Sequence, residues 1–437
     1  MRGLFDTLIK AFRLPDLRKK ILYTLAILAI YQVGGLIPVP GLDRETFTSL
    51  VRGWGQLGSM MDIITGGGLY AATIFAMGIS PYINASIIIQ LLTVVIPALE
   101  NLAKEGEAGR KKMTKINRYG AIGLALLQAS LFCYSTRSAL ITSIPKWLAV
   151  VLVIISFTAG TCFVIWLGER INEKGIGNGI SLLIFSGIVT RLPNMAMNLM
   201  NKSTEINGRI PNAFLGGLAS VAVFVVVTLA AIGIIVFVVY VQNAERRIPV
   251  QYSKKTVGRK VYGGQNSYIP LKVNQSGVMP VIFAMSLLAM PSMIITMFFS
   301  ASTNPVVKWF RDFNSSPYYY IAYFVLIIAF TFFYSLIQFN PIEISNSIQK
   351  NGGFISGVRP GKPTTNYILK TSSNLNWADG LFLSAVCLVP TLISLFTGLD
   401  NVWFAGTSVL ILTGVANDLV VQIESQLVTK NYRGFLD

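Results

Sequence analysis

Long apolar runs divide this chain into ten windows, each long enough to cross a membrane as a helix. A hydrocarbon layer of about 30 Å takes roughly 20 helical residues. Strands of a membrane barrel would instead alternate in polarity and be about half as long. We therefore expect an all-α polytopic membrane protein. The predicted transmembrane helices are residues 21–38, 74–96, 119–136, 147–168, 176–192, 213–241, 277–299, 318–339, 377–397 and 402–423.

Two short patterns each occur twice, in the same order. G-[I/V]-x-P-x-I stands at residues 78–83 and 277–282, and G-x-S-[L/V]-L-I-x-[S/T]-G-[I/V] stands at 179–188 and 406–415. An odd number of crossings between copies makes the halves inverted, with their shared surface at mid-membrane. The sequence thus predicts two pseudo-symmetric halves of five helices. They span residues 21–192 and 213–423, joined by an external connection at 193–212.

The basic residues set the orientation. Of 36 Lys and Arg residues, 27 fall in the segments that are cytoplasmic if the amino terminus is inside. This bias predicts two cytoplasmic termini, residues 1–20 and 424–437. The net charge of +17 then describes a cytoplasmic face that attracts acidic partners, anionic lipid or RNA. The first window lacks a cleavage site, so we expect a retained helix rather than a signal peptide.

Motifs for catalysis, metals or cofactors are missing from the sequence. It contains no histidine, and its three cysteines lie inside apolar windows. It has no P-loop and no G-x-S-x-G motif. The glycine-rich stretch 175–179 lacks the Rossmann spacing and predicts a tight entry into the fifth helix instead. The chain is not expected to be an enzyme, so a partner must supply any energy.

Ionisable residues inside the windows are sparse, which counts against an ion-coupled transporter with inverted repeats. The candidates are Asp379 and Asp418. Asp379 is expected in the first turn of the ninth helix and Asp418 at the cytoplasmic rim, where a capping or interfacial acid is favoured over a proton relay. A third hypothesis, an assembly scaffold, fits the basic loops but not the echoed motifs at mid-membrane.

The segment 57–72 before the second helix is too short and too polar to span a membrane. Its apolar residues are interrupted by Asp62 and by three consecutive glycines, 66–68. Two interpretations are open from the residues alone. One is a re-entrant half-helix followed by a hinge, which requires surrounding protein or a water-filled cavity. The other is an amphipathic helix on the outer surface.

Several longer motifs resemble the SecY/Sec61-alpha family of protein-conducting channels. The resemblance runs from about residue 17 to residue 427, in order, with the same ten helices. The motifs are 37–41 (IPVPG), 77–92 (MGISPYINASIIIQLL), 105–112 (EGEAGRKK), 166–171 (WLGERI), 175–188 (GIGNGISLLIFSGI), 246–252 (RRIPVQY), 270–274 (PLKVN) and 357–361 (GVRPG).

The resemblance implies a clamshell of two halves around an hourglass pore, with a lateral gate to lipid between the second and seventh helices. It favours the re-entrant interpretation, as a plug that fills the outer funnel of the idle channel. The expected plug residues are Met60, Met61, Asp62, Ile63, Ile64, Thr65 and Leu69.

The family's constriction is a ring of six aliphatic side chains, all isoleucine at the matching positions of this chain. An aliphatic ring dewets and blocks hydrated ions, yet deforms around a threaded peptide. Polar substitutions such as Ile83→Asn or Ile411→Asn are therefore expected to raise ion leakage. The ring positions are Ile79, Ile83, Ile184, Ile188, Ile282 and Ile411.

The cytoplasmic loops 242–273 and 338–376 are basic, and by resemblance they dock the ribosome and the motor ATPase SecA. The docking residues are Arg246, Arg247, Lys254, Lys255, Arg259, Lys260 and Arg359. Polar residues near the seam of the lateral gate either tune gating or form ordinary interhelical hydrogen bonds. They are Asn84, Gln90, Thr93, Asn274 and Gln275.

The family also implies partners and a location. The expected partners are the small subunits SecE and SecG, SecA, the ribosome, and signal peptides with their secretory or membrane-protein clients. The surrounding lipid receives the membrane segments. With no transit sequence visible, a bacterial plasma membrane is expected.

Overall fold

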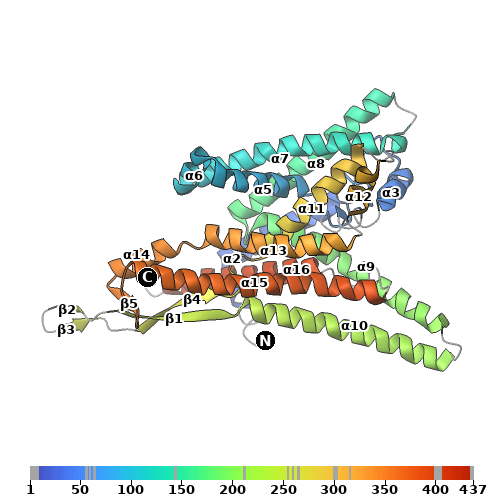
Figure 1. Cartoon of the computed structure of the whole chain (residues 1–437). Coiled ribbons are helices and arrows are strands. Elements are labelled where there is room, and N and C mark those ends of the chain that lie inside the picture. Colours follow the sequence, from blue (N-terminus) through green and yellow to red (C-terminus); the bar gives the residue numbers. More distant parts are fainter. Residues whose placement is uncertain are drawn as a thin grey trace. The chain divides into compact units, whose positions relative to one another are not determined.

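The computed structural model (Figure 1) describes residues 9–54, 58, 61–62, 65–141, 145–209, 213–252, 255–257, 260–262, 266–298, 304–313, 316–397 and 406–433. The chain divides into two compact units. The first comprises Met1–Met197, Ser286–Tyr319 and Val415–Asp437, and the second comprises Asn198–Met285 and Tyr320–Gly414. The first unit thus contains the expected amino-terminal half together with two later segments.

Helices dominate the first unit. α5 packs against α7, α7 against α8, and α2 against α8. Buried alanines on α7, among them Ala121, Ala125 and Ala129, allow this close helix packing. Its elements are α2 (Pro15–Gly34), α3 (Arg44–Gly53), α5 (Ser80–Val95), α6 (Pro97–Lys104), α7 (Glu107–Ser135), the 3₁₀ turn η1 (Arg137–Ala139), α8 (Lys146–Lys174), the start of α9 (Gly179–Arg209) and α12 (Pro305–Asp312).

The helix expected at residues 74–96 begins later, at Ser80, because the chain from Gly66 to Ile79 runs in successive turns. Positive φ angles at Gly66 (+67°), Gly67 (+97°) and Gly78 (+51°) are accessible to glycine at little cost and interrupt a helix. Pro81 then stands in the first turn of α5, where a missing N–H costs nothing. The apolar pattern alone did not reveal this irregular stretch.

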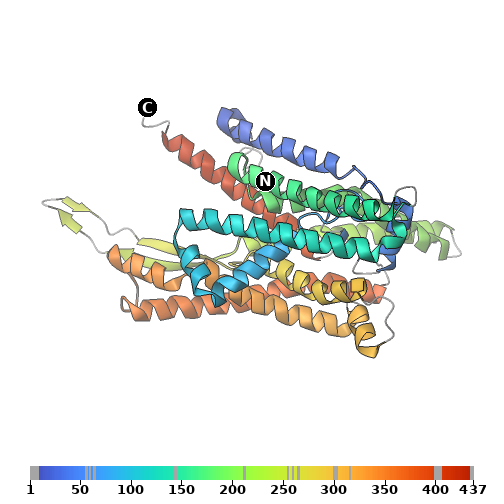
Figure 2. The ribbon, with the colours of Figure 1, turned by 90° about the horizontal axis from the view of Figure 1, so that it is seen from above.

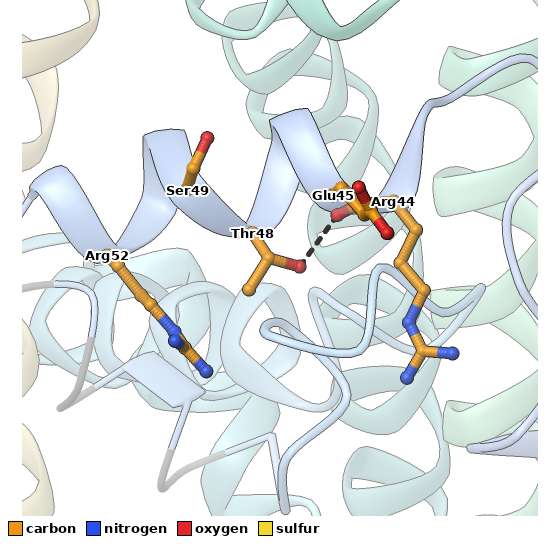
Figure 3. Close-up of a pocket in the computed structure, with 5 residues that line it drawn as sticks. All are labelled: Arg44, Glu45, Thr48, Ser49 and Arg52. Carbon is orange, nitrogen blue, oxygen red and sulfur yellow. Dashed lines mark hydrogen bonds between the residues drawn. The ribbon is translucent and has the colours of Figure 1, made fainter.

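α3 is an amphipathic helix near the start of the first unit. Phe47 and Val51 are fully buried in the apolar core, and Asp43 caps the helix by accepting a hydrogen bond from the Thr46 N–H (3.1 Å). The Thr46 hydroxyl also donates to the Asp43 carboxylate, and these two bonds lower the pKa of Asp43. The opposite face lines a shallow surface pocket of about 490 Å³ with Arg44, Glu45, Thr48, Ser49 and Arg52 (Figure 3).

The second unit combines helices with a small sheet. β1 pairs antiparallel with β4 on one side and β5 on the other, while β2 and β3 form a separate hairpin between β1 and β4. Both views show that hairpin at the tip of the β1–β4 ribbon (Figures 1 and 2). The elements are α10 (Ala213–Gln242), β1 (Glu245–Tyr252), β2 (Lys255–Val257), β3 (Lys260–Tyr262), β4 (Asn266–Lys272), α11 (Met279–Phe298), α13 (Pro317–Gln338), α14 (Pro341–Lys350), β5 (Gly353–Ile355), α15 (Lys362–Thr397) and α16 (Gly406–Arg433), of which α11, α13 and α16 are shared with the first unit.

The chain is predominantly helical, as expected, but the prediction of an all-α fold missed these five strands. Ile248, Val250 and Leu271 point from the sheet into a core shared with Ile348 and Ile368 of α14 and α15. Alternate residues of β1 are therefore buried, as in a strand with one covered face. The regions expected as loops 242–273 and 338–376 thus include ordered structure.

Each of the ten predicted windows overlaps a helix. Within the described residues, four stretches are both long and apolar enough to span a membrane, or five if the α5–α6 pair, bent by 103°, is one span. The four stretches are Lys146–Lys174, Phe224–Gln242, Pro317–Lys350 and Gly406–Val428. Multiple membrane spans are therefore supported, while ten crossings and the pseudo-symmetry of the halves stay predictions.

Candidate functional site

The described residues between α3 and α5 include several that are buried in the first unit. Leu69 is completely buried and belongs to the same apolar core as Phe47 and Phe157. Thr73 forms an antiparallel bridge with Pro38, so the IPVPG motif holds the end of this segment. A helix on the outer surface would leave one face exposed. The burial of the described residues favours the re-entrant interpretation.

The expected plug residues are only partly covered by the structure. Met60, Ile63 and Ile64 lie outside the described residues. Met61 is half-buried against the apolar core, and Thr65 is buried, with its hydroxyl donating to the Asp62 carbonyl (3.2 Å). The described plug residues therefore form a compact, inward-facing turn.

Two glycines beside expected ring positions receive the plug segment. A Cβ atom on Gly66 would lie 2.7 Å from the Cα atom of Gly187, and one on Gly78 would lie 3.3 Å from Cγ2 of Thr65. Gly78 directly precedes Ile79, and Gly187 directly precedes Ile188. The backbone of the expected plug segment thus approaches the chain next to two isoleucines predicted to line the pore.

Asp62 anchors the segment between α3 and α5 through a buried carboxylate. Its side chain is fully buried and forms an ion pair with the guanidinium of Arg191, whose side chain is 20% exposed. Its Oδ1 atom accepts a hydrogen bond from the Tyr70 N–H (2.8 Å). Burying a lone carboxylate is costly, so the cation is needed. Sequence reasoning gave Arg191 no role, although it is an ionisable residue inside the predicted window 176–192, because nothing local marks a partner 129 positions away.

The entry of α9 is tightly specified, which confirms the turn predicted at residues 175–179. Gly177 has a φ of +89°, and the Asn178 side chain accepts hydrogen bonds from the Ile180 and Ser181 N–H groups (3.1 and 3.4 Å). Further along α9, Gln32 of α2 donates to the Ser186 hydroxyl (2.7 Å). These contacts fix the face of α9 that carries Gly187 and Arg191. The helix also continues past Pro193 to Arg209, through most of the expected 193–212 connection.

All six expected ring isoleucines are buried, with exposed fractions between 2% and 8%. Ile79 precedes α5, and its carbonyl accepts the Ile83 N–H (3.1 Å), so the two keep a helical i, i+4 relation. Ile184 and Ile188 share one face of α9. These four belong to the first unit, whereas Ile282 and Ile411 belong to the second. A ring formed by all six stays a prediction.

Three of the five polar residues expected at the lateral gate, Gln90, Thr93 and Gln275, form hydrogen bonds within their own units. Thr93 donates to the Gln90 carbonyl (2.6 Å), and Gln90 donates to Ser86 (3.3 Å). Gln275 accepts from Ser335 and Ser372 (3.1 and 3.0 Å). Gln275 therefore links the segment between β4 and α11 to α13 and α15, as an ordinary interhelical hydrogen bond would. Asn84 and Asn274 are buried.

Two of the basic residues in the expected docking loop 242–273 stand on β1. Arg246 and Arg247 are exposed. Arg247 donates to Glu245 (2.6 Å) and lies 4.7 Å from the ring centroid of Tyr268. The hydrogen bond to Glu245 raises the pKa of Arg247. Lys255 and Lys260 are in the β2–β3 hairpin, and Lys254 and Arg259 lie outside the described residues.

Arg359 projects from a tight turn between β5 and α15. Its side chain is exposed, and glycines on both sides adopt positive φ, +82° at Gly357 and +95° at Gly361. The Arg359 carbonyl accepts a hydrogen bond from the Thr364 hydroxyl (2.8 Å). A rigid turn thus presents this guanidinium to solvent.

The expectation that Asp379 caps the first turn of the ninth helix is wrong, because α15 begins at Lys362, far before the apolar window. Asp379 is completely buried in mid-helix. Its Oδ2 atom accepts a hydrogen bond from the Ser276 hydroxyl (2.6 Å), while Oδ1 has no hydrogen-bond partner in the described part of the chain. Asp418 is exposed on α16.

Comparison with known proteins identifies the family. A sequence model of the SecY family matches residues 73–420. The protein translocase subunit SecY of Streptomyces galbus is 43% identical over 446 residues, covering 98% of both chains. That of Streptomyces lividans is 44% identical over 444 residues, again covering 98% of both. The chain belongs to the SecY family.

Solved structures share the fold of this family member. "The structure of a protein conducting channel" matches with a TM-score of 0.59 at 19% identity, covering 95% of this chain and 92% of the other. Sec61 in the canine ribosome–channel complex matches with a TM-score of 0.56 at 16% identity, with the same coverages. A third match, with a TM-score of 0.58, 19% identity and again the same coverages, concerns a plug domain that stabilises the closed state of a SecY channel.

Proposed function

We propose that this chain forms a protein-conducting channel. It passes unfolded secretory polypeptides across the membrane and releases hydrophobic segments sideways into lipid between α5 and α11. The observation that carries this proposal is the 43% identity to a SecY translocase subunit across 98% of both chains. The buried segment seated beside Ile79 and Ile188 supports it, because a plug must meet the pore-lining residues.

The seal of the idle channel is a combination of the plug segment with the ring of six isoleucines. Branched aliphatic side chains offer water no hydrogen bonds, so a narrow ring excludes hydrated ions. The same side chains yield around a passing peptide without selecting its sequence. A motor or a translating ribosome drives the chain through, since this subunit carries no motif for using ATP.

The exposed arginines of β1 and of the β5–α15 turn form the docking surface for that driver. Solved relatives of this fold include Sec61 in a ribosome–channel complex and an idle yeast Ssh1 complex bound to the 80S ribosome. Basic and aromatic side chains such as Arg247 and Tyr268 suit ribosomal RNA phosphates and bases. SecA uses the same surface during export, and SecE and SecG complete the complex in the bacterial plasma membrane, with both termini cytoplasmic.

Crosslinking of a stalled secretory chain tests the pore. The native cysteines Cys133, Cys162 and Cys387 are first replaced by alanine. A cysteine at Ile282 is then expected to form a disulfide with a cysteine in the stalled chain. A matched cysteine at Val236, which is 62% exposed on α10, should not. Equal crosslinking at both positions, or none at Ile282, would remove Ile282 from the pore.

Charge reversal at Arg359 tests the docking surface. Arg359→Glu should abolish SecA-driven export while leaving insertion of the protein into the membrane intact. Lys362→Glu is the matched control, because Lys362 is also exposed and stands three positions away. Normal export by the Arg359→Glu variant would exclude this arginine from docking.

A further inference from the structure

The plug segment and α9 meet through two contacts. One is the ion pair between Asp62 and Arg191. The other is the approach of Gly66 to Gly187, where even one added carbon would lie 2.7–3.0 Å from the facing Cα atom. Gly187 and Arg191 are four residues apart, so both lie on one face of α9. The two contacts form a single seam, which we call the plug seam.

The local structure holds Asp62 in a geometry suited to this arginine. The Tyr70 N–H donates to Oδ1, which leaves Oδ2 for the guanidinium. The Gly67 N–H donates to the Asp62 carbonyl (2.9 Å). A Cβ atom on Gly67 would lie 3.3 Å from Nη2 of Arg191, so a side chain at this position would crowd the guanidinium.

A buried ion pair of this kind fixes the position of the segment more than it adds to the stability of the fold. The attraction between the charges is largely offset by the loss of their hydration. Removing one partner, however, strands the other charge in a poorly hydrated site. When the segment withdraws into an aqueous funnel, both charges regain water. The pair therefore holds the seated position with a modest opening cost.

We infer that the Asp62–Arg191 pair is a latch that sets how strong a signal segment must be to open the channel. This inference rests on the proposed channel function. Binding of a signal segment has to supply the free energy that separates the pair, because a ligand shifts a two-state equilibrium only through differential affinity. Asp62 and Arg191 are thus specificity-determining residues for clients, although neither touches the client.

The test uses the full complex reconstituted in proteoliposomes, with ion leak of the idle channel and translocation of intact and signal-defective secretory proteins as readouts. Arg191→Leu leaves the Asp62 charge without a cation. We expect the leak to rise roughly tenfold or more and signal-defective clients to pass, since a stranded charge disfavours the seated plug. Arg44→Leu is the matched control, because Arg44 is an exposed arginine of the same unit.

The exchange Asp62→Arg with Arg191→Asp separates a latch from a general loss of folding. The double variant restores opposite charges at the seam and should recover at least part of the seal and of the signal discrimination. Asp62→Asn provides a second single variant that keeps the shape and the acceptor for Tyr70. Unchanged leak and discrimination in both single variants, or a double variant no better than either, would overturn the latch.

The outcome also distinguishes the latch from the function on which it rests. If the unmodified complex translocates intact clients and the seam variants show the same ion leak and signal discrimination as that complex, only the latch fails. If the unmodified complex translocates no client with its motor present, the channel proposal itself fails.

Discussion

Asp62 in the first unit and Asp379 in the second are both completely buried, yet their carboxylates have different partners. Asp62 faces a guanidinium from α9. Asp379 receives one hydroxyl hydrogen bond from Ser276. The first contact joins helix α9 to a segment of turns, and the second joins the segment just before α11 to the middle of α15.

The comparison shows that burial of a carboxylate alone does not reveal what it does. At the plug seam, a full charge is matched by a full charge, so the position is sensitive to the loss of either partner. Around Ser276, the neighbouring contacts are neutral: Gln275 accepts from Ser335 and Ser372. Such a polar network pins helices together and tolerates substitutions that keep the hydrogen bonds.

The largest difference is expected when each aspartate is changed to asparagine. Asp62→Asn leaves Arg191 without its anion and should disfavour the seated plug by about 3 kcal/mol, a roughly hundredfold change in its opening equilibrium. Asp379→Asn keeps an acceptor for Ser276 and should have little effect. The measurement is the labelling rate of a cysteine at Thr65, in a background without the native cysteines, by a membrane-impermeant maleimide.

In that assay, the Asp62→Asn variant should label much faster than the parent. The Asp379→Asn variant should label at the rate of the parent. Equal acceleration by both variants would show that the two buried carboxylates are equivalent and would break the comparison.

A smaller effect is expected from the backbone contact of the plug seam. Gly187→Val adds three carbons where a Cβ atom would already lie 3.0 Å from Cα of Gly66, and overpacking of this kind costs about 1–3 kcal/mol. Gly123→Val on α7 is the control, because a Cβ atom at Gly123 meets nothing within 4 Å. Faster labelling at Thr65 in the first variant alone would support close seating; identical rates would mean that the seam accommodates the side chain.

The smallest difference is expected at the hydrogen bond between Ser276 and the Asp379 carboxylate in the second unit. Ser276→Ala removes the hydroxyl donor to Asp379, and the loss of one such hydrogen bond costs about 1–3 kcal/mol at most. In the Asp379→Asn background the same substitution should cost less, since a hydrogen bond to a neutral acceptor is weaker. Thermal unfolding of the purified complex measures this difference. Equal shifts in both backgrounds would show that the charge on Asp379 does not strengthen the bond.

The sequence predicted the positions of the helices well because apolar runs are local. The ten windows overlap helices, and the glycine stretch at 175–179 forms the expected turn. The apolar pattern missed the late start of α5. The residues from Ile74 to Ile79 are mostly apolar, and such a run fits a helix and buried turns equally well. β1 was missed although Ile248 and Val250 alternate with exposed residues, because Pro249 argues against a strand. Pro249 is tolerated there since β5 pairs only with residues 250–252.

The functional residues divide in the same way. The ring isoleucines were predicted from motifs that lie within short stretches of the sequence, and the plug was predicted from its position in the resembling family; both stay predictions. Arg191 was missed although it is an ionisable residue inside the predicted window 176–192, because its partner lies 129 positions earlier, on a turn that brings Asp62 inward. Likewise, Asp379 resembled a cap until the structure showed α15 extending back to Lys362.

α15 has a mechanical consequence. It begins three residues after Arg359 and runs without interruption from Lys362 to Thr397, a length of about 54 Å at 1.5 Å per residue. Along the way it carries the Ser372 and Asp379 contacts to Gln275 and Ser276, just before α11. Under the proposed docking, force applied at the exposed turn would be transmitted along this one helix to the segment that leads into α11.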